Sequence, residues 1–329
     1  MSPGWNWDFE DEPRASRRAP APAPAREAAG PPPPPSAPQP IDPRARFRRR
    51  RLGAAAGLVL LVVVLVLALG GSHHHGAVSS AGTRTPGPHA ATLAPPGPDE
   101  LEREDKGVDS VLGYTPFVKE GGTQGRDVAL TFDDGPGPYT PQVLDVLERE
   151  HVPATFFVIG QEIHDFGSST EREIRDGFTI GDHTENHPMM AQLSAHDQHE
   201  QLFEQAARIE LLGGRKPKLF RPPYGSFNTT TFHLLHQMKM LMVLWSVDTD
   251  DYEQPGVETI VKRVIEGAKP GAIFLLHDAG GNREQTVAAL PQIIHELRVR
   301  GFHLVSVPRL LAEDPPPHGL PLPTSLAGD

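Results

Sequence analysis

The chain has 329 residues, among them 36 prolines, 32 glycines and no cysteine, and a net charge of −11. Without cysteine, disulfide bonds and thiolate metal sites are excluded, so any metal must be held by histidine and carboxylate groups. Residues 1–52 carry 10 arginines and 6 acidic residues, a net charge of +4, whereas the part after residue 71 carries 21 basic and 36 acidic residues, a net charge of −15. Such an acidic part is a poor partner for nucleic acid, so we expect no nucleic-acid binding and a neutral or locally presented substrate.

The first 52 residues are rich in proline, alanine and arginine and include the run from Pro31 to Pro35. They show no apolar periodicity, so they cannot bury enough apolar surface to offset the entropy of folding. We predict that residues 1–52 form a disordered tail, and the segment that follows places this tail in the cytoplasm.

An uncharged apolar segment extends over residues 53–71, GAAAGLVLLVVVLVLALGG. At the helical rise it is long enough to cross a hydrocarbon core of about 30 Å, so we predict one transmembrane helix that binds the chain to the cytoplasmic membrane. Six arginines from Arg44 to Arg51 precede it, and no lysine or arginine follows until Arg84. The positive-inside rule then places the N-terminus in the cytoplasm and the remainder outside it. The alternative is a signal peptide, cleaved near residue 70, and a secreted protein.

The rest of the chain divides into three parts. Residues 72–122 are rich in glycine, proline, serine and threonine, and we expect them to form an extracytoplasmic linker. Residues 123–312 alternate short β-branched or apolar runs with amphipathic segments, which is typical of a catalytic domain of the α/β class. Residues 313–329 form a proline-rich tail.

Within the domain, the alternation predicts a parallel (β/α) barrel, in which chemistry lies where strands end. One helix is expected from Pro141 to Arg149 with Thr140 as its N-cap, and another over residues 197–212 after Ser194. The predicted strands are DVALTF, ATFFVI, KLFR, MVLWSV, AIFLL and HLVSV.

The first motif is TFDDGPGP, in which Asp133 and Asp134 follow a strand and precede a sharp turn. Two adjacent carboxylates repel each other unless a positive group lies beside them, and a metal satisfies that need. One carboxylate can then bind the metal while the other handles a proton. A capped turn without any metal is the alternative for this motif alone.

The second motif is GDHTENHP, in which His183 and His187 are four residues apart. In a helical turn the two side chains would point the same way and form a pair of imidazole ligands. Two histidines and one aspartate make a triad that leaves coordination positions open for water and substrate. A pair of surface histidines is the alternative, but the acidic turn about 50 residues earlier favours a metal site.

Three further motifs carry polar residues at strand ends. LFRPPYGSF contains Arg221, whose guanidinium could orient a carboxylate through a bidentate pair, and also Tyr224. WSVDTDDYEQPG contains Asp251 and Tyr252, and IFLLHDAG places His277 at the end of a very apolar strand. An imidazole in that position indicates a catalytic role, although a buried structural histidine is the default for such a residue alone.

Taken in order, TFDDGP, HTENHP, RPPYG, the VDTDDY segment and LLHD resemble the carbohydrate esterase family 4 polysaccharide deacetylases, also called the NodB homology domain. The resemblance covers about residues 123–312, and five ordered motifs make it highly specific. It implies a distorted (β/α) barrel. It also implies a divalent ion, most commonly Zn2+ with Co2+ or another ion as alternatives, held by Asp134, His183 and His187.

The resemblance further implies the roles of the remaining motif residues. Asp133 matches the general base and His277 the acid that protonates the departing amine, while Arg221 and Asp251 orient these two residues. The backbone N–H of Tyr224 matches an oxyanion donor, Leu275 lines the pocket for the acetyl methyl group or is simply a core leucine, and Tyr252 stands where the family usually has tryptophan.

These observations predict a metal-dependent hydrolase that removes N-acetyl groups from a polysaccharide. Peptidoglycan N-acetylglucosamine is the leading substrate, because a single-span anchor would hold the domain beside the cell wall. Chitin oligomers and acetylated xylan are alternative substrates, and an inactive wall-binding protein is the alternative that is not an enzyme.

Overall fold

The computed structural model describes residues 95–319 and residue 321. The predicted tail over residues 1–52, the predicted membrane helix over residues 53–71 and the first part of the predicted linker lie outside the described residues. Among the residues that are described, no helix is both long and apolar enough to cross a membrane.

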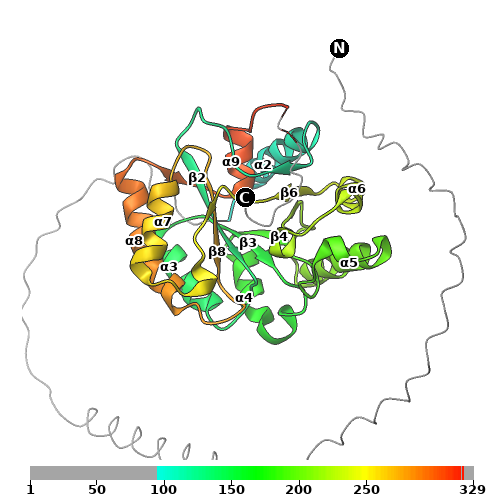
Figure 1. The fold of residues 1–329 in the computed structure, drawn as a ribbon, viewed down its shortest axis with the longest axis horizontal. Helices are drawn as coiled ribbons and strands as arrows, with labels where there is room; N and C mark the ends of the chain where they lie inside the picture. The colour runs from blue at the N-terminus through cyan, green and yellow to red at the C-terminus, as the bar shows by residue number, and fades with distance from the viewer. Residues whose placement is uncertain (1–94, 320, 322–329) are drawn as a thin grey trace, which may run out of the picture. The chain divides into compact units, whose positions relative to one another are not determined.

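The described residues form a nine-stranded sheet in which the paired strands run parallel. The strand order is β1-β6-β5-β4-β3-β2-β8-β7, and β9 pairs with the start of β2. The sheet curls into a half-barrel, which confirms the α/β class and agrees with a distorted barrel (Figure 1). The strands are β1 (Phe117–Val118), β2 (Asp127–Asp133), β3 (Thr155–Val158), β4 (Thr179–Asp182), β5 (Leu219–Phe220), β6 (Leu241–Val243), β7 (Val247–Asp248), β8 (Ile273–His277) and β9 (His303–Leu304).

Most of these strands were predicted from their apolar runs. The segment MVLWSV is two strands, β6 and β7, rather than one, because the chain leaves the sheet between residues 243 and 247. The sequence reasoning missed β1 and β4. Strand β4 has the sequence TIGD, which contains one β-branched apolar residue and a glycine and therefore carries little strand signal.

Side chains on β2 alternate between the outer and inner sides of the curled sheet. Val128, Leu130 and Phe132 belong to the hydrophobic cluster that packs under the outer helices. Ala129 belongs to a second cluster on the inner side. Because side chains along a strand alternate with a period of two, Asp133 also points to the inner side. The carboxyl end of β2 therefore brings a carboxylate into the mouth of the barrel.

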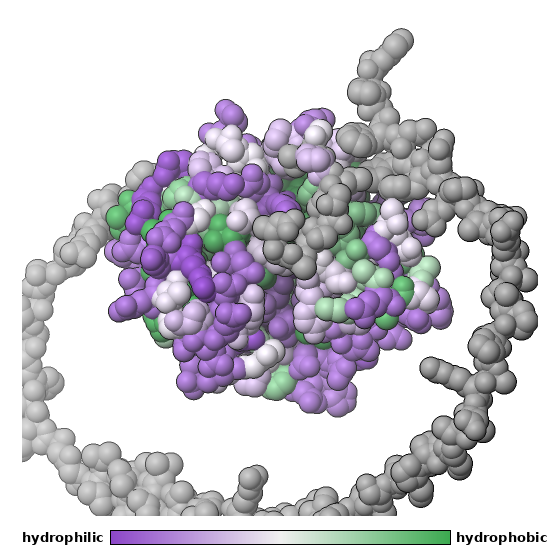
Figure 2. Space-filling model, viewed as in Figure 1, coloured by the Kyte–Doolittle hydropathy of each residue, from purple (hydrophilic) through white to green (hydrophobic). Residues whose placement is uncertain are grey.

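Six helices pack around the outside of the sheet. In Figure 1, α3, α7 and α8 lie together beside β2 and β8, whereas α5 and α6 lie on the opposite side. The face in Figure 2 is mostly hydrophilic, with hydrophobic residues in small scattered groups. The helices are α3 (Thr140–Glu150), α4 (Ile163–Arg175), α5 (Ala195–Leu211), α6 (Thr229–Met238), α7 (Val257–Gly267) and α8 (Glu284–Val299), and single turns lie at η1 (Met190–Gln192), η2 (Pro223–Gly225) and η3 (Asp251–Glu253).

The two helices predicted from N-cap signals are present. Ser194 caps α5 as expected, since its Oγ accepts a hydrogen bond from the backbone N–H of Asp197. The prediction for Thr140 is wrong, because Tyr139 is the N-cap residue and Thr140 is the first residue of α3. The Thr140 hydroxyl instead accepts from the backbone N–H of Gly137 at 2.7 Å.

Helices α2 (Pro98–Leu112) and α9 (Val307–Glu313) close the amino-terminal end of the barrel. Val108 and Val111 of α2 pack with Leu310 of α9 in the inner cluster. The helices approach closely at Gly107, where a Cβ would lie 2.6 Å from the Cα of Ala312. The predicted linker over residues 72–122 is therefore wrong in its second half, and the domain begins well before residue 123.

The predicted C-terminal tail also begins too early at residue 313. The backbone N–H groups of Gln124 and Gly125 donate to the Asp314 carboxylate at 2.8 and 2.7 Å. The Tyr114 hydroxyl donates to the Pro316 carbonyl at 2.7 Å, and the His318 ring stacks on the Tyr114 ring. The folded domain thus includes residues on both sides of the predicted range 123–312.

Candidate metal centre and catalytic residues

Strand β2 ends in the two adjacent aspartates of the first motif. Asp133 is its last residue, and Asp134 follows with a left-handed backbone (φ 70°). This conformation interrupts the strand alternation, so both carboxylates reach the same imidazole: Asp133 Oδ2 and Asp134 Oδ1 lie 3.7 and 3.6 Å from His183 Nε2. The two carboxylates therefore face the same imidazole, and the sequence predicted that they would share one site.

His183 and His187 also come together, although not by the predicted geometry. The expected helical turn is wrong, because Thr184 and His187 have left-handed backbones (φ 70° and 59°) and no helix spans these residues. The backbone N–H of His187 instead donates to Thr184 Oγ1 at 3.0 Å, which closes a tight loop. The two imidazole rings lie 4.9 Å apart between centroids.

Asp134, His183 and His187 offer three ligand atoms that lie within 4.8 Å of one another. His183 Nδ1 lies 2.7 Å from the carbonyl oxygen of Arg221. A carbonyl can only accept, so Nδ1 carries a proton and Nε2 is the ring nitrogen that is left to bind a metal. His187 Nε2 lies 3.2 Å from Asp134 Oδ1.

The electrostatics of this group also suit a divalent metal. Asp134 Oδ1 is buried and has no hydrogen-bond partner among the described residues, so it needs a cation. Burial opposes the charge of Asp134, but the contacts with His183 and His187 outweigh it and hold the pKa of this carboxyl well below its usual range. One ionised carboxylate and two imidazoles are a donor set that divalent transition metals bind readily.

Arg221 is fully buried behind Asp133. Its Nη1 donates to Asp133 Oδ1 and to Thr131 Oγ1, both at 2.7 Å. Nε and Nη2 donate to the carbonyl oxygens of Val243 and Leu244, so the predicted bidentate pair with a carboxylate is wrong. The single contact holds Oδ1 and leaves Oδ2 of Asp133 facing the histidines.

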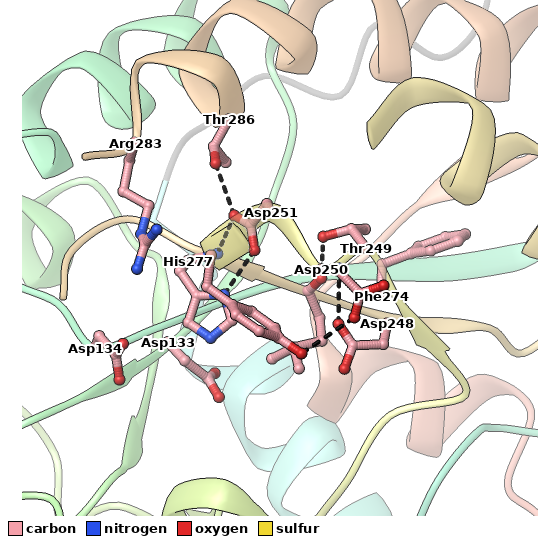
Figure 3. A network of polar contacts seen from close by, with 12 residues as sticks. Asp133, Asp134, Asp248, Thr249, Asp250, Asp251, Phe274, His277, Arg283 and Thr286 are labelled. Atoms are coloured by element: carbon pink, nitrogen blue, oxygen red, sulfur yellow. Dashed lines mark hydrogen bonds and ion pairs between the residues drawn. The ribbon is translucent and has the colours of Figure 1, made fainter. Parts of the chain in front are cut away.

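On the other side of the candidate metal-binding group, the Asp251 carboxylate and the His277 imidazole form a hydrogen-bonded pair (Figure 3). His277 Nδ1 lies 2.7 Å from Asp251 Oδ1, and Thr286 donates to Asp251 Oδ2 at 2.7 Å. Burial opposes a charge on His277, but the hydrogen bond and the negative charge of Asp251 outweigh it and raise the pKa of His277 to about 9. His277 is therefore an imidazolium at neutral pH in the metal-free protein.

Two tyrosines flank the site on the surface. Tyr224 is 60 % exposed, and its ring lies 4.6 Å from the ring of His187. Tyr252 is 43 % exposed, and its ring lies 5.3 Å from that of His277. Leu275 is buried on β8, two residues before His277, and so points to the same inner side. The two tyrosines thus lie beside His187 and His277, and Leu275 points to the same inner side as His277.

Tyr252 is held by a small polar network rather than by packing alone. Its hydroxyl donates to Asp250 Oδ1 at 3.1 Å, and Arg263 forms an ion pair with Asp250 Oδ2 at 2.9 Å. Asp248, the first acid of this motif, contacts the backbone N–H of Asp250, and burial raises its pKa. Asp248 and Asp250 therefore support the loop that carries Asp251 and Tyr252.

Sequence reasoning gave no role to a buried acidic pair behind the aspartate turn. Asp278 accepts a hydrogen bond from Thr140, and burial raises its pKa to about 7. Glu173 on α4 is also fully buried, and its two oxygens have no hydrogen-bond partner among the described residues. Burial and the nearby Asp278 raise the pKa of Glu173 well above its usual value. Asp278 stands in the LLHD motif, but nothing in the sequence marks Glu173.

Arg283, at the start of α8, was also missed. It is only 3 % exposed, although arginine is rarely buried without a charged partner. Its position immediately after the glycines of the fifth motif could have drawn attention to it. Figure 3 shows its side chain extending from the start of α8 toward the end of β8.

The half-barrel and its site define a class of α/β barrel proteins in which a buried carboxylate and an imidazole lie on two sides of a candidate metal-binding group. The polysaccharide deacetylase family model matches residues 120–243. A peptidoglycan-N-acetylglucosamine deacetylase of Bacillus cereus is 42% identical over 187 residues, 56% of this chain and 87% of the relative. A chitooligosaccharide deacetylase of Sinorhizobium fredii is 37% identical over 210 residues, 60% of this chain and 98% of the relative.

A solved structure agrees with these relatives. The Bc1960 peptidoglycan N-acetylglucosamine deacetylase is similar with a TM-score of 0.59 and 33% identity, covering 61% of this chain and 94% of that one. The chain belongs to the polysaccharide deacetylase family, which confirms the resemblance found in the five motifs.

Proposed function

We propose that this chain hydrolyses N-acetyl groups on a polysaccharide and that N-acetylglucosamine of peptidoglycan is its substrate. One observation carries the proposal: a buried base and a charged acid lie on two sides of a metal-binding group. Asp133 is fixed by Arg221, and His277 is fixed by Asp251. Relatives that act on peptidoglycan and on chitin oligomers support the substrate class.

Zinc is the ion that we propose for Asp134, His183 and His187. When bound there, a divalent metal supplies Lewis-acid polarisation of the acetamide carbonyl and acidifies a water molecule. The donor set of two imidazoles and one carboxylate suits zinc and leaves positions open for water and substrate. Cobalt is the alternative with the same preferences for ligands.

The chain's own residues divide the proton transfers between them. Oδ2 of Asp133 faces the ligand group and accepts the proton of the attacking water, while Arg221 holds the other oxygen. His277 donates a proton to the departing amine when the amide C–N bond breaks, and its pKa of about 9 in the metal-free protein supports this role. The backbone N–H of Tyr224 stabilises the charge that develops on the carbonyl oxygen, and Leu275 contacts the acetyl methyl group.

Acetate release tests this function directly. The full-length chain, purified in detergent and supplied with zinc, is incubated with peptidoglycan, chitin oligomers and acetylated xylan, with Asp133→Asn as the inactive control. We expect acetate from peptidoglycan first and a loss of about 100-fold or more in Asp133→Asn. If no acetate appears from any of the three, an inactive wall-binding protein is the better assignment.

We also propose that residues 53–71 anchor the chain in the cytoplasmic membrane with the domain outside. The apolar length and the arginines before it support this topology. Fractionation of cells that express the full chain tests it. A mature N-terminus near residue 70 in the medium would show cleavage and secretion instead.

A further inference from the structure

Two arginines are buried in the described domain, and they differ in one respect. Arg221 has a carboxylate partner and uses all three guanidinium nitrogens as donors. Arg283 forms no ion pair with any described residue, and it donates only to two carbonyl oxygens of its own loop, Ala279 from Nε at 2.6 Å and Asn282 from Nη1 at 3.3 Å. A buried charge without a counter-charge is costly unless another group pairs with it.

The loop that carries Arg283 lies beside the candidate metal ligand Asp134. The loop that carries it leaves β8 directly after His277 and Asp278, and Gly280 packs so closely on Asp134 that a Cβ there would overlap the carboxylate. The next glycine, Gly281, lies beside the Arg283 guanidinium. In Figure 3 the guanidinium lies on the side of His277 where Asp134 also lies. The loop that holds this guanidinium therefore packs directly on one of the candidate metal ligands.

The surroundings favour an acidic or oxygen-rich ligand. Arg283 is the N-cap residue of the 16-residue helix α8, whose free backbone N–H groups add a partial positive charge. The loop residues Gly280, Gly281 and Asn282 are exposed and uncharged, and the acidic group that packs on this loop is Asp134, which forms no ion pair with Arg283. A guanidinium with free N–H groups binds a carboxylate or another acyl oxygen in preference to sugar hydroxyls.

We propose that Arg283 binds the acyl oxygens of the lactyl substituent on the sugar next to the one that is deacetylated, and so selects peptidoglycan strands over chitin. This inference rests on the proposed function and deepens it. Peptidoglycan carries a lactyl group on every second sugar, whereas chitin carries only neutral acetamides and hydroxyls. The guanidinium acts on substrate choice and leaves the proton transfers to Asp133 and His277.

The test compares two substrates with the zinc-loaded full-length chain. One is a peptide-free peptidoglycan strand with free lactyl carboxylates, and the other is a tetramer of N-acetylglucosamine. The variants are Arg283→Gln, which can still donate to the Ala279 carbonyl, and Arg149→Gln, which removes the same charge from an exposed helix surface. Binding of both glycans is also measured in the Asp133→Asn background, where no turnover is needed.

We expect Arg283→Gln to raise KM for the peptidoglycan strand by about 10-fold or more, with kcat nearly unchanged. KM for the tetramer should stay within about twofold, and Arg149→Gln should change neither value. An equal rise in KM on both glycans would show that Arg283 only supports its loop. A lower zinc content in Arg283→Gln would show that Arg283 instead balances the negative charge of Asp134. Either result overturns the proposal, as does an unchanged KM for the strand. The binding series remains informative if the wild type releases no acetate, which separates this test from that of the proposed function.

Discussion

Asp251 contacts His277 twice: Oδ1 lies 2.7 Å from the ring Nδ1, and Oδ2 accepts from the backbone N–H at 2.9 Å. The first contact fixes the ring, since an ionised carboxylate can only accept and Nδ1 must carry a proton. The second contact ties the end of β8 to η3. One carboxylate thus favours the charged form of the His277 imidazole and also fixes its position in the site.

Replacing Asp251 with asparagine should move the alkaline limit of activity. Burial opposes a charge on His277, but the hydrogen bond and the negative charge of Asp251 outweigh it and raise the pKa of His277 to about 9 in the metal-free protein. Without this charge, burial lowers the pKa of His277, and we expect the alkaline limb of kcat/KM to shift down by at least about one pH unit.

The same pair affects stability in a defined direction. The folded-state pKa of His277 is raised, so its contribution to stability is complete below a pH of about 6.5 and is lost as the pH rises through about 9. The difference in Tm between the wild type and Asp251→Asn should therefore be largest at low pH. For the activity measurement, an alkaline limb of kcat/KM that does not move in Asp251→Asn would contradict the assigned pair.

His187→Ala should abolish retention of the metal. The variant leaves only Asp134 and His183, and two protein ligands hold a divalent ion weakly. We expect elemental analysis to show about one zinc per wild-type chain and almost none in the variant. His199→Ala, at a half-buried position on α5, is the matched control and should keep the metal. Equal metal content in the two variants would refute the ligand assignment.

Glu173→Gln should stabilise the fold at neutral and alkaline pH. Burial raises the pKa of Glu173 in the folded state, so its contribution to stability is complete below a pH of about 4.5 and is lost as the pH rises through the folded-state pKa. Glutamine is neutral at every pH and has nearly the same shape. We expect the Tm of the variant, relative to the wild type, to rise between pH 5 and pH 8, and a constant difference would speak against a buried neutral acid.

A fragment of residues 123–312 should be much less stable than one of residues 95–319. The shorter fragment lacks α2, so Val307, Leu310 and Leu311 of α9 lose the partners Val108 and Val111. Deletion of several buried apolar side chains costs several kcal/mol, comparable with the total stability of a domain. Urea unfolding measures the difference, and equal midpoints would show that α2 does not belong to the cooperative unit.

The chemistry of this site was more predictable than its geometry. Asp133, Asp134 and His277 end predicted parallel strands, and neighbouring parallel strands deliver such residues to one edge. The left-handed backbones of Asp134, Thr184 and His187 could not be predicted, because non-glycine residues seldom adopt them and tertiary contacts must hold them. These conformations, rather than a helical turn, bring the ligands together.

The amino-acid composition did not reveal where the folded domain begins and ends. The α2 sequence PDELEREDKGVDSVL is mostly polar and charged, and such a composition is typical of a linker. Its few apolar side chains become meaningful only when α9, about 200 residues later, supplies the opposite surface. Arg283 and Glu173 escaped notice for a related reason, since burial depends on neighbours far away in the sequence.

The closure of the barrel by α2 and α9 has a further consequence for how the domain is carried. Pro95 packs on Gly177, just before the start of β4, and residues 314–318 lie against Tyr114 and Gly122. Both ends of the described domain therefore lie at the closed end of the barrel, whereas the candidate metal ligands lie at the carboxyl ends of the strands. Neither described end of the domain therefore covers the mouth of the barrel.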